Sequence, residues 1–293
     1  MAGIYIHIPF CKSRCKYCDF FSTTQLEKKG AYVDALLAEW NDRKQVLTEK
    51  VQTLYIGGGT PSSLDHAELL RIIQGILGDT PSEGPIEITI EANPGDITEE
   101  KARAWRAMGI NRLSIGIQSF DDHLLQLIGR RHNAEQAIQA VRTAQTEGIS
   151  NISIDLMYAL PGQTMALWQK DITQALELHV PHISSYGLIY EDGSLLTQLL
   201  EQGKINAIDE EEEIQMYDYL VEQLIKHGYE HYEVSNFALP GRHSKHNSSY
   251  WNETPYLGLG AGAHSYDGQK RWWNIADIDL YIDQAMNRQL LPE

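Results

Sequence analysis

Short β-forming runs alternate with segments of helical periodicity along most of this 293-residue chain. In that order, consecutive strands run parallel and a helix crosses over the sheet between each pair. The expected strands are 3–8, 52–56, 86–90, 112–117, 152–157 and 182–188. The expected helices are 31–49, 65–77, 98–108, 133–146 and 164–178, with N-caps at Asp65, Thr98 and Asn133 and C-terminal stops at Gly109 and Gly148.

Six right-handed strand–helix units favour an α/β fold, a partial (three-quarter) TIM-like (β/α)6 barrel whose open side admits a large ligand. A flat, doubly wound sheet is the alternative that the pattern leaves open. We expect the barrel over residues 1–236. Residues 237–293 are interpreted as a small C-terminal cap, the start of a further domain that is truncated here.

Composition excludes several classes of function. The chain has 40 acidic and 24 basic residues, a formal charge of -16, which disfavours nonspecific binding of nucleic acid. It has no run of about 18 apolar residues that could cross a membrane, and its first ten residues lack the basic region of a signal peptide. We therefore expect a cytoplasmic protein without a transmembrane segment.

The three cysteines of the chain, Cys11, Cys15 and Cys18, all lie within eight residues, in FCKSRCKYCDF. Thiolates are the usual ligands of iron–sulfur clusters, and three of them would leave one iron of a four-iron cluster free for a small chelating molecule. Zinc is the main alternative, with His7 as a possible fourth ligand. A disulfide framework is less well supported, because the count is odd and no secretory signal is present.

Polar motifs follow the ends of five successive predicted strands. The cysteine loop follows the first strand, Gly57-Gly58-Gly59 the second, Glu91-Ala92-Asn93-Pro94 the third and Gln118-Ser119 the fourth, while Asp155 lies in the fifth. Ligands bind at the C-terminal ends of parallel strands, so these groups are expected to meet at one rim. The glycine loop lacks the signatures of phosphate and dinucleotide sites, and we expect a ligand that carries an amine and a carboxylate.

The sequence closely resembles the radical S-adenosylmethionine (SAM) superfamily, whose C-x3-C-x2-C signature with an aromatic residue before the last cysteine matches Cys11, Cys15, Tyr17 and Cys18. Within it, the chain is similar to the oxygen-independent coproporphyrinogen III oxidase-like family. The resemblance covers nearly the whole chain through YIHIPFCKSRCKYCDF, YIGGGTPS, IEANPGD, SIGIQSF, IGRRH, IDLMYALPGQT and HNSSYW.

This resemblance implies a [4Fe-4S] cluster on the three cysteines, with SAM bound to the fourth iron through its amino and carboxylate groups. The residues that would line SAM are Tyr5, Tyr17, Gly58 and Glu91. The positions that match contacts to a second SAM or to the substrate region are Gly59, Thr60, Gln118, Arg130 and Asp155. An electron from a donor such as flavodoxin or ferredoxin would cleave SAM to a 5'-deoxyadenosyl radical, which in the oxidases starts decarboxylation of coproporphyrinogen propionates.

Departures from the oxidases point to the HemW branch, which consists of heme chaperones. The oxidases carry a further cysteine where this chain has Phe20, and an N-terminal extension for which this chain has no room before its first strand. The HNxxYW motif of the HemW branch is present from His246 to Trp251. An imidazole can ligate heme iron and cations can pair with heme propionates, so His246, Arg242 and Lys245 are the candidate heme residues.

Two functions remain open on these grounds. One is a carrier that binds heme as cargo and passes it to acceptor proteins. The other is an oxygen-independent coproporphyrinogen III oxidase, so the sequence leaves open whether the protein is an enzyme. The family usually continues into a further helical domain beyond the last residues of this chain.

Overall fold

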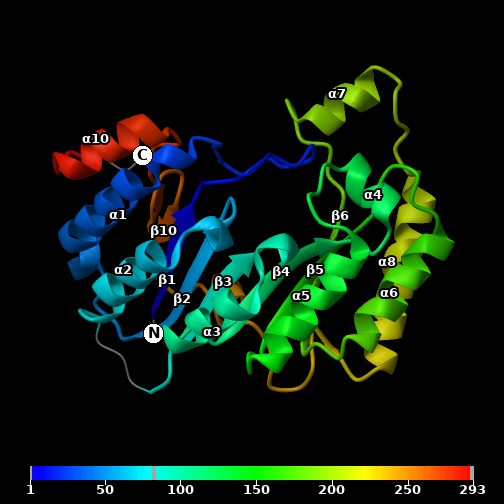
Figure 1. Cartoon of the computed structure of the whole chain (residues 1–293), viewed down its shortest axis with the longest axis horizontal. Coiled ribbons are helices and arrows are strands. Elements are labelled where there is room, and N and C mark those ends of the chain that lie inside the picture. The colour runs from blue at the N-terminus through cyan, green and yellow to red at the C-terminus, as the bar shows by residue number, and fades with distance from the viewer. Residues whose placement is uncertain (1, 81–83, 291–293) are drawn as a thin grey trace.

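The computed structural model describes residues 2–80 and 84–290, which form one mixed eleven-stranded sheet with helices packed against it (Figure 1). The strand order is β11-β10-β9-β1-β2-β3-β4-β5-β6-β8-β7. The strands are β1 (Ala2–Ile8), β2 (Val51–Gly58), β3 (Glu87–Ala92), β4 (Arg112–Gln118), β5 (Ile152–Tyr158), β6 (His182–Gly187), β7 (Glu230–Glu233), β8 (Asn236–Ala238), β9 (Tyr256–Leu259), β10 (His264–Tyr266) and β11 (Arg271–Trp273).

The helices follow the strands in the expected alternation. They are α1 (Lys29–Arg43), α2 (His66–Leu77), α3 (Glu99–Ala107), α4 (Asp122–Leu127), α5 (Ala134–Thr146), α6 (Met165–Glu177), α7 (Leu195–Glu201), α8 (Glu210–Lys226), α9 (Lys245–Trp251) and α10 (Ile278–Met286). Short 3-10 turns are η1 (Leu26–Lys28), η2 (Lys44–Val46), η3 (Pro61–Ser63) and η4 (Pro94–Asp96). Within the described residues, none of these helices has both the length and the apolar character needed to span a bilayer.

The expected partial barrel is confirmed. Strands β1 to β6 are parallel neighbours in chain order, and the edge strands β11 and β7 do not pair with each other, so the sheet stays unclosed. Each expected strand lies within two residues of its predicted bounds. The expected caps are also present, since the side chains of Asp65, Thr98 and Asn133 accept hydrogen bonds from backbone N–H groups in the first turns of α2, α3 and α5. The first helix ends earlier than expected, at Arg43, and η2 follows it.

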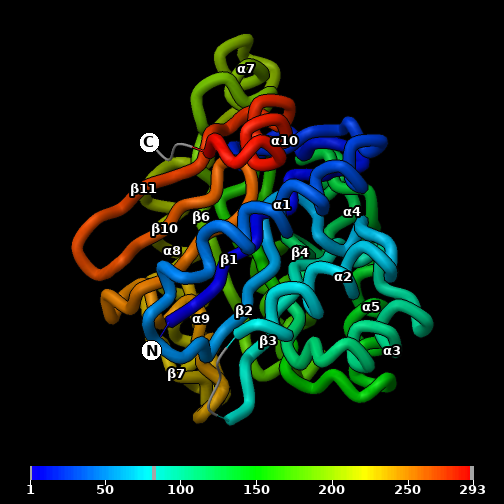
Figure 2. Tube along the Cα trace, turned by 90° about the vertical axis from the view of Figure 1, so that its left-hand side faces the viewer, coloured from blue at the N-terminus to red at the C-terminus, as the bar shows by residue number. Residues whose placement is uncertain are grey.

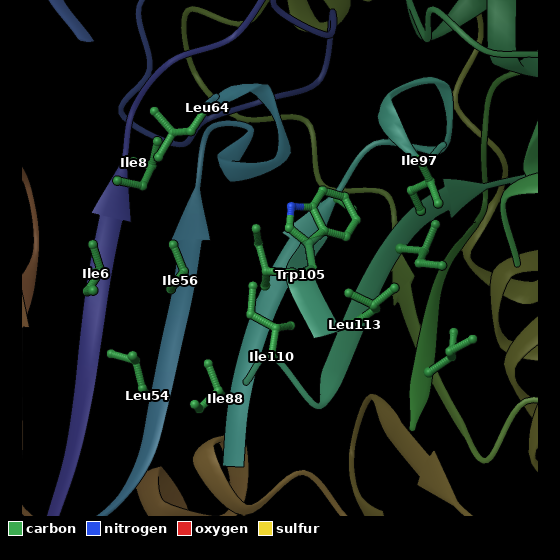
Figure 3. Close-up of a cluster of buried hydrophobic side chains, with 14 of the residues drawn as sticks. Ile6, Ile8, Leu54, Ile56, Leu64, Ile88, Ile97, Trp105, Ile110 and Leu113 are labelled. Carbon is green, nitrogen blue, oxygen red and sulfur yellow. The ribbon is translucent and has the colours of Figure 1, made fainter. Parts of the chain in front are cut away.

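Alternate residues of the parallel strands face opposite sides of the barrel wall. The outward side chains are mostly isoleucine and leucine, and they pack with residues of the surrounding helices such as Trp105 of α3 (Figure 3). Many of the inward side chains are polar, in contrast to the apolar layers that usually fill a TIM barrel. They include Thr53, Tyr55, Glu91, Ser114, Asp155, Ser153 and His182, which hydrogen-bond one another or other groups inside the barrel. The barrel interior can therefore hold a polar ligand.

The residues after 236, predicted as a small C-terminal cap over 237–293, add strands at both ends of the sheet. Strand β8 pairs antiparallel with β6, whereas β9 pairs in parallel with β1. Helix α10 packs along α1 (Figure 2). The C-terminal segment is thus a structural part of the barrel.

A buried carboxylate of α1 fastens this C-terminal segment. Glu39 accepts hydrogen bonds from the Tyr281 hydroxyl at 2.6 Å, from Asn274 Nδ2 at 2.7 Å and from Gly260 N at 2.9 Å, and it pairs with Arg43 at 2.8 Å. Burial raises the pKa of Glu39, while these partners oppose the increase. Because the donors come from three separate segments, one side chain connects α1, the loop after β9 and α10.

Candidate cofactor site

A cavity of about 470 Å³ opens at the C-terminal ends of the parallel strands, within the size range of sites for small cofactors. All three cysteines of the chain line it. Most of the other lining residues come from the parallel strands β1 to β6 or from the segments that follow them. They include Tyr17, Tyr55, Gly58, Gly59, Thr60, Glu91, Ser114, Gln118, Arg130, Asp155, Met157, Ser184, Tyr186 and Ile189, and Asn247 is added from α9. The polar groups therefore converge on one rim, as the order of motifs along the sequence predicts.

The cysteine loop between β1 and α1 is fastened to the barrel at its ends and its middle. Cys11 N donates to Thr23 O at 2.9 Å, which joins the start of the loop to its end. In the middle, Lys16 N donates to Ile128 O at 3.0 Å and Lys16 O accepts from Leu196 N at 2.8 Å. These backbone hydrogen bonds position the loop that carries the three thiols.

The thiols have polar neighbours within the protein. Cys11 Sγ lies 3.4 Å from Thr60 Oγ1, and Arg130 Nη1 donates to Cys15 Sγ at 3.3 Å. Burial raises the pKa of Cys11 and of Cys18, so both favour the protonated form until a metal displaces the proton. A further polar atom of the lining, Ser22 Oγ, is buried without a hydrogen-bond partner among the described residues.

The donor set fits an iron–sulfur cluster better than a single ion. Within residues 2–80 and 84–290, no three histidine, cysteine or carboxylate groups are close enough to hold one metal ion. The thiolates that bind a four-iron cluster are farther apart than those that bind a single ion. The wider spacing suits three cysteines arranged around a shared cavity. His7, the possible fourth zinc ligand, is buried, and its ring nitrogens bond Phe21 O at 2.8 Å and the Tyr5 hydroxyl at 3.1 Å.

Each glycine of the Gly57-Gly58-Gly59 loop is required by a different neighbour. A Cβ on Gly57 would lie 2.8 Å from Tyr55 and 2.9 Å from Glu91 Oε1. Gly58 has φ +110°, and its Cβ would lie 2.7 Å from the His7 ring. A Cβ on Gly59 would lie 2.7 Å from the backbone carbon of Pro9. The loop therefore needs glycine for close packing of the site itself, in addition to any approach of a ligand.

Glu91, at the end of β3, points its carboxylate into the cavity between two donors. The Tyr55 hydroxyl donates to Oε1 at 2.8 Å and Gly58 N donates to Oε2 at 3.0 Å. Burial raises the pKa of Glu91 to about 7, although the hydrogen bond from Tyr55 opposes the increase. A cationic ligand in the cavity would favour the ionised carboxylate, which makes Glu91 suited to bind an ammonium group.

The next strands contribute a second carboxylate and a buried guanidinium. Ser114 Oγ donates to Asp155 Oδ1 at 3.1 Å, and burial raises the pKa of Asp155. Arg130 Nη2 donates to Gly116 O at 2.5 Å, so Arg130 bridges β4 and the cysteine loop. Gln118, in the predicted site, has φ +72° at an irregularity where β4 pairs with β5.

Asp96 of η4 joins three loops around the rim. Its carboxylate, 1% exposed, accepts from Lys12 Nζ at 2.8 Å, from Ser62 Oγ at 3.1 Å and from Arg131 Nη2 at 3.3 Å. Burial tends to raise the pKa of Asp96, but Lys12 and Arg131 outweigh burial and keep it below its usual value. One carboxylate thus connects the cysteine loop, the loop after β2 and the loop before α5.

The structure places the predicted heme residues elsewhere. His246 is 1% exposed at the opposite end of the barrel, and its ring nitrogens bond Thr53 Oγ1 at 2.8 Å and the Tyr250 hydroxyl at 2.9 Å. Both nitrogens are therefore in use, and the ring has no free position for iron. Arg242 and Lys245 are exposed on the outer surface and are not part of the cavity lining.

All the other predicted site residues except Tyr5 line the cavity. Tyr5 lies below it and beside the rings of Tyr55 and His246, at centroid distances of 6.1 Å and 6.4 Å. Sequence reasoning missed Tyr55 and Tyr186, although each precedes or follows a polar inward residue at a spacing of two. It also missed Asn247, although this residue belongs to the HNxxYW motif, because α9 reaches the barrel from a distant part of the chain.

Comparisons with known proteins agree with the resemblance seen in the sequence. The model of the Radical SAM superfamily matches residues 5–174. The chain is 40% identical over 290 residues to a protein of Lactococcus lactis described as heme chaperone HemW, covering 99% of this chain and 76% of that protein. It is 36% identical over 270 residues to the heme chaperone HemW of Escherichia coli, covering 89% of this chain and 69% of the relative.

Among solved structures, coproporphyrinogen III oxidase (HemN) from Escherichia coli, described as a radical SAM enzyme, matches with a TM-score of 0.86 at 25% identity. The match covers 99% of this chain and 70% of that one. The domain match, the HemW relatives and the shared fold lead to one assignment. The chain belongs to the radical SAM superfamily and, within it, to the family of the heme chaperone HemW.

Proposed function

We propose that this protein binds a [4Fe-4S] cluster through Cys11, Cys15 and Cys18 and binds SAM at the iron that lacks a protein ligand. One observation carries the proposal: the only three thiols of the chain line the same cavity as the carboxylate of Glu91. The SAM-binding residues that we propose are Tyr17, Gly58, Gly59, Thr60, Glu91, Gln118, Arg130 and Asp155, with Tyr5 acting from below. The bound cluster and SAM would supply one-electron chemistry, and the protein positions them and limits access of water.

We propose further that the protein is a heme chaperone, with heme as cargo that it transfers to acceptor proteins. The HemW relatives support this function. Apolar side chains at the cavity are also unusually exposed, namely Phe20 and Ile189, each 68% exposed, and Tyr186, 43% exposed. Such side chains suit the flat apolar face of a porphyrin.

The proposed setting is the cytoplasm, because three free thiols at one site need a reducing compartment. If the cluster is reduced during the functional cycle, a flavodoxin or ferredoxin would supply the electron. With the cluster bound, Arg130 would hold the cysteine loop through a charge-assisted hydrogen bond to Cys15 Sγ.

The test uses protein purified and reconstituted without oxygen. We expect about four irons and four sulfides per chain, one equivalent of SAM bound with the cluster present, and saturable heme binding seen as a Soret band. Stoichiometric zinc without iron would contradict the cluster. Absence of saturable heme binding would contradict the chaperone.

The alternative function is a radical SAM oxidase of coproporphyrinogen III, which the structural match to HemN favours. Reduced, SAM-loaded protein is therefore incubated with coproporphyrinogen III and its products are separated by mass. We expect the substrate to remain intact, whereas stoichiometric loss of carboxyl groups would establish the oxidase.

A further inference from the structure

The histidine of the HNxxYW motif lies where the parallel strands begin, at the end of the barrel opposite the cysteines. His246 N donates to Glu87 Oε1 at 3.2 Å, at the first residue of β3. A Cβ on Gly3, near the start of β1, would lie 3.3 Å from its ring. Figure 2 shows α9 near the N-terminus and the beginning of β2. Helix α9 therefore closes the floor of the barrel.

The hydrogen bonds of the His246 ring hold it in one orientation. Thr53 of β2 bonds Nδ1 at 2.8 Å and Tyr250, one turn along α9, bonds Nε2 at 2.9 Å. Burial, followed by the positive charge of Arg112, lowers the pKa of His246 to about 3, so the ring is neutral. A neutral, buried and fully bonded ring is suited to packing.

The His246 ring packs on the residue that holds Glu91. It stacks on Tyr55 with the ring centroids 5.0 Å apart and an angle of 25° between the planes. The hydroxyl of Tyr55 in turn donates to Glu91 Oε1 at 2.8 Å. The neighbour of His246 on α9, Asn247, lines the cavity itself. Direct contacts therefore run from the floor of the barrel to the proposed SAM-binding carboxylate.

We propose that His246 is a positioning residue of the cofactor cavity, which holds the Tyr55 ring so that its hydroxyl fixes the carboxylate of Glu91 for SAM. The role rests on the proposed binding of SAM but differs from the heme ligation that the motif suggests. It explains why both ring nitrogens bond to the protein. It also means that the first residue of the motif supports the cofactor site from the floor of the barrel, at the end opposite the cysteines.

The experiment compares His246→Ala with His246→Phe in anaerobically reconstituted protein. SAM affinity is measured by calorimetry, and heme affinity is measured from the Soret band. The environment of the cluster is followed by the EPR spectrum of the reduced cluster with and without SAM. We expect His246→Ala to weaken SAM binding about tenfold, since a hydrogen bond to a charged group contributes that much. His246→Phe keeps a ring against Tyr55 and is expected to restore SAM affinity to within about threefold, while neither variant alters heme affinity.

A matched control is His182→Ala. His182 is equally buried at the start of β6 and bonds Ser153 and Tyr232, but it does not contact Tyr55. We expect it to lower thermal stability while SAM affinity stays unchanged. If His246→Ala and His182→Ala weaken SAM binding equally, the effect is general destabilisation and the proposal is wrong.

Tyr55→Phe tests the hydrogen bond from Tyr55 to Glu91 with almost no change in side-chain volume. It also keeps the proposal testable if His246→Ala fails to fold. Removing only the hydroxyl is expected to weaken SAM binding about tenfold. Unchanged SAM affinity in Tyr55→Phe overturns the proposal, as does loss of heme binding in His246→Phe with SAM binding intact. Failure of the wild-type protein to bind SAM would instead refute the proposed function, so the two failures are distinguishable.

Discussion

Replacing Glu91 with glutamine should change how the stability of the cofactor-free protein depends on pH. Burial raises the pKa of this carboxyl from 4.5 to about 7. Because the folded state binds the proton more tightly than the unfolded state, the free energy of unfolding of the wild type falls as pH rises from about 4.5 to about 7. In Glu91→Gln this contribution is absent.

The size of the effect follows from the shift. At about 1.4 kcal/mol per pKa unit, a shift of this size corresponds to about 3 kcal/mol. Water in the cavity reaches part of the side chain and reduces the effect, so we expect the variant to gain about 2 kcal/mol relative to the wild type between pH 5 and pH 8.

The assay is urea unfolding followed by circular dichroism at pH 5, 6, 7 and 8 for both proteins. Glu99→Gln on the surface of α3 is the control for loss of a carboxylate. The quantity compared is the change with pH in the difference between variant and wild type, because glutamine also alters the hydrogen bonds to Tyr55 and Gly58. A difference that stays constant with pH, or that changes in the opposite direction, would refute the reasoning. The same variant should bind SAM more weakly, because it lacks the negative charge.

Three further substitutions test the packing around the site. Gly57→Ala should lower stability by about 1–3 kcal/mol, the usual cost of overpacking, and reduce SAM affinity; wild-type values in urea unfolding and calorimetry would contradict the close contacts described for this glycine. Asp96→Asn should cost about 1–2 kcal/mol, because Lys12 and the other donors lose a charged acceptor, and it should lower the iron content after reconstitution; unchanged iron content would show that this carboxylate does not organise the cysteine loop. Tyr281→Phe should cost about 1–2 kcal/mol through the lost bond to Glu39, and an unchanged melting temperature would argue against this connection between α1 and α10.

Much of the barrel could be predicted from the sequence because its signals are local. Apolar periodicity and side-chain caps such as Asn133 depend on residues a few positions apart, and so do the C-terminal stops Gly109 and Gly148, which have positive φ. Convergence of the polar loops followed from one rule about parallel strands. For these features, short-range physics and the order of elements were sufficient.

The remaining features depend on contacts between distant parts of the chain. Strand β9 is four residues long and pairs in parallel with β1, and no local pattern reveals that partner. The surroundings of His246 also depend on such distant contacts. A histidine in a polar stretch resembles an exposed ligand, but Thr53, almost two hundred positions earlier, converts it into a buried, fully bonded ring.

The pairing of β9 with β1 has a consequence for biosynthesis. Strand β1 keeps one edge unsatisfied until its partner β9, which starts only at Tyr256, has been synthesised. During that interval the nascent chain presents an open strand edge, which favours wrong pairing. Pairing of that edge with β9 would therefore be a late step in folding of the barrel, and the floor of the barrel could form only after α9 and β9 have been synthesised.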